Sequence, residues 1–137
     1  MSSVVNGGTR YSAHLLKSVK KFYTGETVYE YTPTVLDSVA ISEGNYDILI
    51  EGMRQVVTSS ASLTRYFSGV GVTVGGKTGT AEVSGGKRDL ALFGAFAPLD
   101  DPEIVSVCVL EQGVNGGNAA IPISDLFKEY FDVDNEG

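Results

Sequence analysis

Three apolar, strand-like stretches follow one another in the second half of the chain, joined by turns of only a few residues. They occupy residues 70–83, 89–97 and 104–110, with turn signals at 84–87 and 100–102. Parallel strands need a crossover connection of a dozen or more residues, so these short turns favour an antiparallel meander. The middle stretch is apolar on both faces, which predicts that it is the central strand.

A hairpin is predicted ahead of this meander. Apolar and β-branched residues recur with a period near two over residues 11–31, around a turn at Thr24–Gly25. This pattern is typical of two short strands. Pro33 weakens strand character beyond it, because proline cannot donate a ladder hydrogen bond.

Two helices complete the predicted elements. The first begins at Ser42, with Glu43 in the first turn where negative charge suits the helix dipole, and it ends near residues 58–60. Its apolar positions recur at helical spacing: Leu49, Met53, Val56 and Val57. The second is expected to be capped by Asn118 and to tolerate Pro122 in its first turn. Its apolar face is formed by Leu126, Phe127, Tyr130 and Phe131. The acidic residues 132–137 are expected to be frayed.

These elements predict an α+β fold: an antiparallel sheet (three-stranded meander plus hairpin), a middle helix and a C-terminal helix. The 137 residues, 42% of them hydrophobic, are enough for a single domain over residues 1–137. The net charge of −7 argues against a nucleic-acid partner, because no basic stripe exists to neutralise phosphates. No apolar run approaches the ~20 residues of a membrane span, so no direct membrane insertion is expected. No His, Cys, Asp and Glu set has metal-ligand spacing, and no cofactor is expected.

Two motifs overlap at Lys77. Residues 71–78 match the phosphate-loop pattern G-x-x-x-x-G-K-[ST] completely. That loop binds phosphates only where a buried strand precedes it and a helix follows it. Residues 64–69 do not read as a buried strand, and residues 79–86 are poor helix formers. Nucleotide binding through a P-loop is therefore the remote alternative, and it predicts magnesium-dependent nucleotide affinity.

The second motif is Lys77-Thr78-Gly79-Thr80 on a strand, a combination suited to binding a carboxylate. Lys77 supplies positive charge, and Thr78 and Thr80 supply hydroxyl donors. The two threonines are two positions apart and so share one side of the strand, while Gly79 lets a substrate backbone approach.

The Lys-Thr-Gly triplet is a signature of penicillin-binding proteins and class A β-lactamases. With its flanks, the chain resembles class B penicillin-binding proteins of the peptidoglycan-elongation type over almost its whole length. The matching segments, in the family's order, are residues 6–8 with 14–19, 51–57, 92–98 with 101–103, and 120–131. The departures are His14 in place of a proline, Leu92 in place of an aromatic residue, and residues 59–62, which lack a glycine-threonine pair. They concern packing and loop shape more than the Lys77 motif.

The resemblance implies a C-terminal fragment of the penicillin-binding and serine β-lactamase-like fold. It implies part of a D,D-transpeptidase, which performs serine acyl transfer on D-Ala-D-Ala peptides and is the target of β-lactams. The ligand would be a peptidoglycan stem peptide or a β-lactam, bound by Lys77, Thr78, Gly79 and Thr80. Lys77 would also be catalytic, and the backbone N–H of Thr80 would be one donor of an oxyanion hole. The intact protein would be anchored in the bacterial membrane and act on its extracytoplasmic face.

Several activities remain open at this point. A carboxypeptidase, a β-lactamase and a β-lactam sensor share these motifs with a transpeptidase. A non-catalytic binding or sensor module that uses the same fold is the main alternative function. The upstream S-x-x-K motif of the intact protein would separate an enzyme from such a module.

The family's nucleophile has no convincing counterpart in the sequence. It is a serine one turn before a lysine, in an S-x-x-K motif on a helix. Residues 18–21 match this spacing, but they lie in the predicted hairpin, where Ser18 and Lys21 would point to opposite faces. Only 56 positions separate Lys21 from Lys77, fewer than the family layout requires. The chain is therefore expected to need a missing N-terminal part of the domain as its partner, and to be inactive alone although its parent is an enzyme.

Overall fold

The structure is a computed structural model that describes residues 1–85 and 88–131. The predicted acidic tail and the second half of the predicted turn at 84–87 lie outside these residues. The chain divides into two compact units, Ser2–Ile41 and the remainder. Among the helices of the described residues, none combines the length and the apolarity that a membrane crossing requires.

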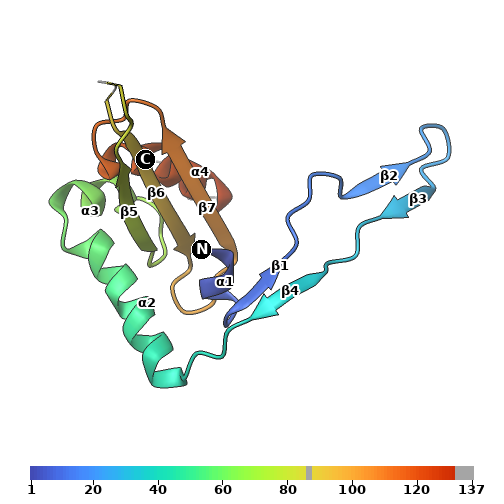
Figure 1. Cartoon of the computed structure of the whole chain (residues 1–137), viewed down its shortest axis with the longest axis horizontal. Helices are drawn as coiled ribbons and strands as arrows, with labels where there is room; N and C mark the ends of the chain where they lie inside the picture. Colours follow the sequence, from blue (N-terminus) through green and yellow to red (C-terminus); the bar gives the residue numbers. More distant parts are fainter. Residues whose placement is uncertain (86–87, 132–137) are drawn as a thin grey trace. The chain divides into compact units, whose positions relative to one another are not determined.

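The first unit is an antiparallel arm of short strands (Figure 1). Helix α1 (Ser2–Val5) precedes β1 (Thr9–Tyr11), β2 (Ser18–Lys20), β3 (Thr27–Glu30) and β4 (Val35–Ser38). Strand β2 pairs with β3, and β1 pairs with β4. The connecting turn is closed by a hydrogen bond from the Lys21 N–H to the Glu26 carbonyl (2.8 Å) and holds Gly25 at a φ of 70°. The predicted hairpin around Thr24–Gly25 is thus confirmed.

The second unit contains the predicted meander. Strands β5 (Gly75–Ala81), β6 (Leu90–Ala97) and β7 (Ile104–Leu110) pair antiparallel in the order β5-β6-β7. The central position of β6 is confirmed. Strand β5 begins later than predicted, because the chain bends at Gly71, whose φ of 78° is incompatible with a continuous strand from residue 70.

Helical segments that precede the sheet in the sequence and others that follow it pack together with its strands (Figure 1). They are α2 (Glu43–Thr58), α3 (Ala61–Phe67), the 3₁₀ turn η1 (Gly116–Ala119) and α4 (Ala120–Tyr130). Helix α2 begins after Ser42 and ends at Thr58, as predicted. Helix α3 was not predicted; the Ser60 hydroxyl caps it by accepting from the Leu63 N–H (3.4 Å).

The predicted cap of the last helix is wrong. The Asn118 side chain instead donates to the Gly113 carbonyl (2.8 Å). Asn115 caps the preceding turn η1, because its Oδ1 accepts from the Gly117 N–H (2.9 Å). The physical reason is that η1 already supplies the turn that leads into α4, so α4 starts at Ala120 without a side-chain cap.

The core lies between one face of β6 and the helices α2, α3 and α4. Phe93 of β6 stacks on Phe67 of α3 with ring centroids 5.8 Å apart, and Phe67 meets Phe127 of α4 at 6.3 Å. Phe93 and Phe127 are fully buried. Aromatic pairs at these separations add to the stabilisation from buried area, so this row of rings ties the sheet to two helices.

An ion pair on α2 has a strong electrostatic effect. The Arg54 guanidinium donates to both carboxylate oxygens of Glu51 (2.6 Å each), and the Gln55 amide donates to the same carboxylate (2.9 Å). The Arg54 hydrogen bonds first, then the one from Gln55, lower the pKa of Glu51 to about 2. The carboxylate therefore stays ionised at any pH above that value.

Candidate functional site

Lys77, Thr78, Gly79 and Thr80 lie in the middle of β5. Among the described residues β5 pairs only with β6, so its other side is a free edge. Lys77 and Thr80 are exposed, and Thr78 and Gly79 are half-buried. The predicted site residues are therefore contiguous, on a strand and reachable from solvent.

The register with β6 shows how the side chains are divided between the two faces. Thr78 and Thr80 lie opposite Phe93 and Ala91, which belong to the face of β6 that packs against the helices. The two threonines thus share one side of β5, as the sequence predicts, whereas Lys77 projects from the other. The Lys77 side chain bends over its own strand, and its ammonium group donates to the carbonyl oxygen of the next residue, Thr78 (2.7 Å).

This hydrogen bond also indicates the direction of the backbone groups. The Thr78 carbonyl accepts from Lys77, as expected of a group on the free edge. In an antiparallel ladder the residues alternate between those that bond to the partner strand and those that point away from it. Thr80 is two positions on, so its backbone N–H also faces the free edge, where a ligand could accept from it.

Glycines upstream of Lys77 leave room for aromatic rings. A Cβ at Gly76 would lie 2.7 Å from Cζ of Phe93, and a Cβ at Gly75 would overlap the ring of Phe96. Such separations are closer than real Cβ contacts allow, so both positions require glycine as long as the rings stay in place.

The loop before α4 packs directly on the site strand. A Cβ at Gly116 would lie 2.7 Å from the Gly79 carbonyl oxygen, 2.8 Å from that of Leu92 and 3.0 Å from the Gly79 nitrogen. Gly116 therefore supports β5 at Gly79, a contact across 37 positions that no local pattern signals.

We expect Gly116→Ala to destabilise the protein by about 1–3 kcal/mol, the usual range for overpacking. The new methyl group would meet backbone atoms of β5 and β6, which cannot turn aside as a side chain can. Urea denaturation followed by far-UV circular dichroism measures the change. The matched control is Gly44→Ala on α2, which has no neighbour within 4 Å of its Cβ and should be neutral or stabilising. Equal effects of the two changes would contradict close packing at Gly116.

The structure disfavours two of the sequence matches. Lys77 and Thr78 lie inside β5, which continues to Ala81 without a helix, so the phosphate-loop interpretation of residues 71–78 is wrong. Ser18 lies in strand β2, as predicted, and not on a helix. A further match to S-x-x-K, at residues 84–87, follows β5 in the sequence, and its last two positions lie outside the described residues.

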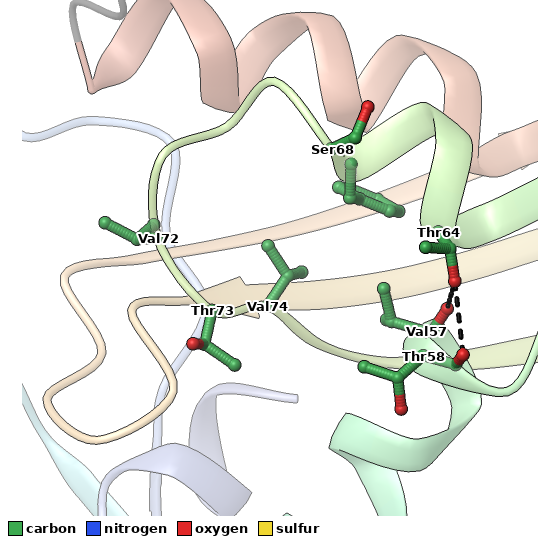
Figure 2. Close-up of a pocket in the computed structure, with 8 residues that line it drawn as sticks. Val57, Thr58, Thr64, Ser68, Val72, Thr73 and Val74 are labelled. Atoms are coloured by element: carbon green, nitrogen blue, oxygen red, sulfur yellow. Dashed lines mark hydrogen bonds between the residues drawn. The ribbon is translucent and has the colours of Figure 1, made fainter.

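A pocket of about 230 Å³ lies beside the segment that leads into β5 (Figure 2). It is lined by Val57, Thr58, Thr64, Phe67, Ser68, Val72, Thr73 and Val74. The Thr64 hydroxyl lies 3.0 Å from the Val57 carbonyl and 3.2 Å from that of Thr58, and so satisfies the end of α2. None of Lys77–Thr80 lines this pocket, so it is a feature of the α2–α3 junction. In the part of the chain that the structure describes, no three His, Cys, Asp or Glu side chains are grouped to hold a metal.

Comparisons with known proteins give a consistent result. Penicillin-binding protein 2B of Streptococcus pneumoniae strain R6 is 30% identical over 145 residues, which cover 95% of this chain and 21% of that protein. Stage V sporulation protein D of Bacillus subtilis is 33% identical over 132 residues, covering 90% and 20%. The chain thus spans about a fifth of the length of the curated relatives it matches.

Solved structures show the same likeness in three dimensions. Penicillin-binding protein 2B from S. pneumoniae R6 superposes with a TM-score of 0.72 at 26% identity, over 99% of this chain and 24% of that one. Penicillin-binding protein A from M. tuberculosis, solved as a ceftriaxone acyl-enzyme complex, gives a TM-score of 0.73 at 25% identity, over 93% and 29%. The α+β fold predicted from the sequence is confirmed by these neighbours. The family model described as the penicillin binding protein transpeptidase domain matches residues 1–129, and the chain belongs to that family.

Proposed function

We propose that this chain contributes the Lys77–Thr80 wall of the active site of a peptidoglycan D,D-transpeptidase. The single observation that carries the proposal is that this motif lies on the free edge of β5, with Lys77 and Thr80 exposed. Residues 1–137 would form part of one transpeptidase domain, because the family match runs through both units of the chain.

The ligand would be a peptide that ends in D-Ala-D-Ala, or a β-lactam. Both carry a carboxylate, which the Lys77 ammonium and the threonine hydroxyls would bind. To do so, Lys77 would give up its hydrogen bond to the Thr78 carbonyl, an exchange that costs little because this bond is exposed. The M. tuberculosis neighbour solved as a ceftriaxone acyl-enzyme supports β-lactam recognition by this fold.

In the reaction, a serine hydroxyl attacks the carbonyl carbon of the D-Ala-D-Ala amide. The carbonyl oxygen becomes an oxyanion, to which the Thr80 N–H at the free edge would donate one hydrogen bond. The amide C–N bond then breaks, terminal D-alanine leaves with the serine proton, and an acyl-serine ester remains. An amine from a second stem peptide takes the acyl group and restores the serine.

The nucleophilic serine is proposed to lie outside this chain, in a longer protein held at the extracytoplasmic face of the bacterial membrane. The wall that carries it would also be the partner of β5. This chain alone should therefore bind a β-lactam weakly and form no covalent adduct with it. A stoichiometric penicillin adduct in the intact mass of this chain would overturn this part of the proposal.

A backbone-amide NMR titration of the chain with a β-lactam tests the proposed ligand. We expect weak, saturable shifts confined to residues 77–82, and about tenfold weaker binding after Lys77→Met, as for the loss of one hydrogen bond to a charged group. Lys20→Met, on the exposed strand β2, is the matched control and should not change the affinity. Shifts that are scattered over the chain, or equally sensitive to both changes, would contradict recognition at β5. A flat titration would mean that binding needs the second wall.

A further inference from the structure

We propose that Phe93 and Phe96 of β6 are positioning residues for the candidate site. Their rings would hold β5 from its two faces at Gly75 and Gly76, directly before Lys77. This inference rests on the proposed function of Lys77–Thr80, because it assigns the two rings the task of setting where that segment lies.

Phe93 holds the strand from the helix-facing side. It is fully buried, and it is the cross-strand partner of Thr78. Its ring reaches diagonally to Gly76, where a Cβ would lie 2.7 Å from Cζ. The ring cannot easily move away, because Phe67 of α3 stacks against it at 5.8 Å. Val57 of α2 approaches the same glycine, with Cγ2 3.3 Å from the position of a Cβ.

Phe96 holds the strand from the opposite side. It is three positions from Phe93 in β6, so the two rings project from opposite faces of the sheet. Phe96 is also fully buried and lies directly opposite Gly75 in the register. A Cβ at Gly75 would overlap its ring and lie 3.0 Å from Cδ1 of Leu99.

Together the two contacts fix β5 at its start, where the exposed part of the strand begins. Gly75 and Gly76 are buried, whereas Lys77 is exposed. An edge strand has ladder hydrogen bonds on one side only, which leaves its height above the sheet less restrained than that of a central strand. Rings packed on bare glycine backbone from both faces supply that restraint, in the way that aromatic residues cover glycines on neighbouring strands.

A double-mutant cycle between Gly76→Ala and Phe93→Leu tests the contact in the 137-residue chain. The methyl group at position 76 needs the space that the shortened side chain at 93 vacates. Each single change is expected to raise the unfolding constant by some factor. The factor for the double variant should be at least about fivefold smaller than the product of the two single factors, as for residues in direct contact. Additive effects would overturn the contact. If Phe93→Leu does not fold, Phe93→Met, which keeps more volume, takes its place in the cycle.

The positioning role itself is tested by the amide shifts of residues 77–80 in the free protein. Gly76→Ala and Phe93→Leu should displace these resonances. The control is Phe127→Leu, which also shortens a fully buried phenylalanine, but on α4, whose sheet contacts are with β6 and β7. It should leave them in place at comparable loss of stability. Equal displacement by Phe127→Leu would reduce Phe93 to a core residue and overturn the proposal.

A β-lactam titration of the same variants separates this inference from the proposed function. If the wild-type chain binds, Gly76→Ala should weaken the affinity several-fold more than Phe127→Leu does. If the wild-type chain does not bind, ligand recognition by this chain alone fails, while the cycle and the amide shifts still decide whether the rings position the strand. The equivalent pair Gly75→Ala and Phe96→Leu should repeat the result from the other face.

Discussion

Replacing Thr80 by proline is expected to lower the rate constant of β-lactam acylation about 10²–10³-fold in a complete transpeptidase domain that carries this strand. Proline removes the backbone N–H that we propose as an oxyanion donor. Because that N–H faces the free edge of β5, its loss takes no hydrogen bond from the β5–β6 ladder, and proline is tolerated at such positions. Stopped-flow acylation at several β-lactam concentrations gives the rate constant and the initial affinity separately.

The proper reference for Thr80→Pro is Thr80→Ala, which also lacks the hydroxyl but keeps the N–H. Thr80→Ala should mainly weaken the initial affinity, because the hydroxyl is proposed to bind the ground-state carboxylate. Thr80→Pro should lower the rate constant far below that of Thr80→Ala, because the oxyanion exists only in the transition state.

Thr78→Pro controls for the effect of a proline on this edge. Its N–H is also on the free edge by the alternation of the ladder, but it has no proposed part in stabilising the oxyanion. We expect it to alter affinity rather than the acylation rate constant. If Thr80→Pro and Thr80→Ala had the same rate constant, or if Thr78→Pro lowered it as much as Thr80→Pro, the assignment of the Thr80 N–H would be wrong.

The elements that could be predicted from the sequence are those fixed by local patterns. The short turns at 84–87 and 100–102 favour an antiparallel meander, and the apolar character of both faces of β6 predicts its central position. Helix α2 was found from its periodicity and from Ser42 at its start. These signals are sufficient because each depends on neighbours within a few positions.

The misses have a different origin. Helix α3 has only seven residues, and it is stabilised by the burial of Leu63 and Phe67 against distant segments rather than by propensity. The pairing of β1 with β4 joins strands of three and four residues that lie on either side of the β2–β3 hairpin. Neither strand is long enough to show a period of its own.

The candidate site was predictable in composition but not in support. The order of residues 77–80 implied a strand with Thr78 and Thr80 on one side, and the register with β6 agrees. The packing of Gly116 on Gly79 and of two rings on Gly75 and Gly76 depends on tertiary neighbours. Glycine-rich sequence around Lys77 is compatible with a loop, but these glycines pair with β6 in the ladder, and the rings of Phe93 and Phe96 lie close to Gly76 and Gly75.

Phe127→Ala is expected to cost about 3–5 kcal/mol of stability, the range for truncating a buried phenylalanine. Phe127 is fully buried on α4, and its ring meets Phe67 of α3 at 6.3 Å and Phe131 at 6.4 Å. Because domains of this size are stable by only about 5–15 kcal/mol, the loss would remove a large share of the total. The sequence contains no tryptophan, so urea denaturation is followed by far-UV circular dichroism.

The neighbouring residue Leu126 provides the control for Phe127→Ala. Leu126 is 46% exposed on the same helix, and Leu126→Ala leaves helix propensity favourable while it removes little buried area. Its effect should stay below about 1 kcal/mol, as for most surface substitutions. Similar losses from the two changes would mean that α4 is not anchored through the aromatic row. A large loss from Phe127→Ala alone would show that α4 is anchored through the aromatic row, because the ring of Phe127 packs on Phe67 of α3, which in turn stacks on Phe93 of β6.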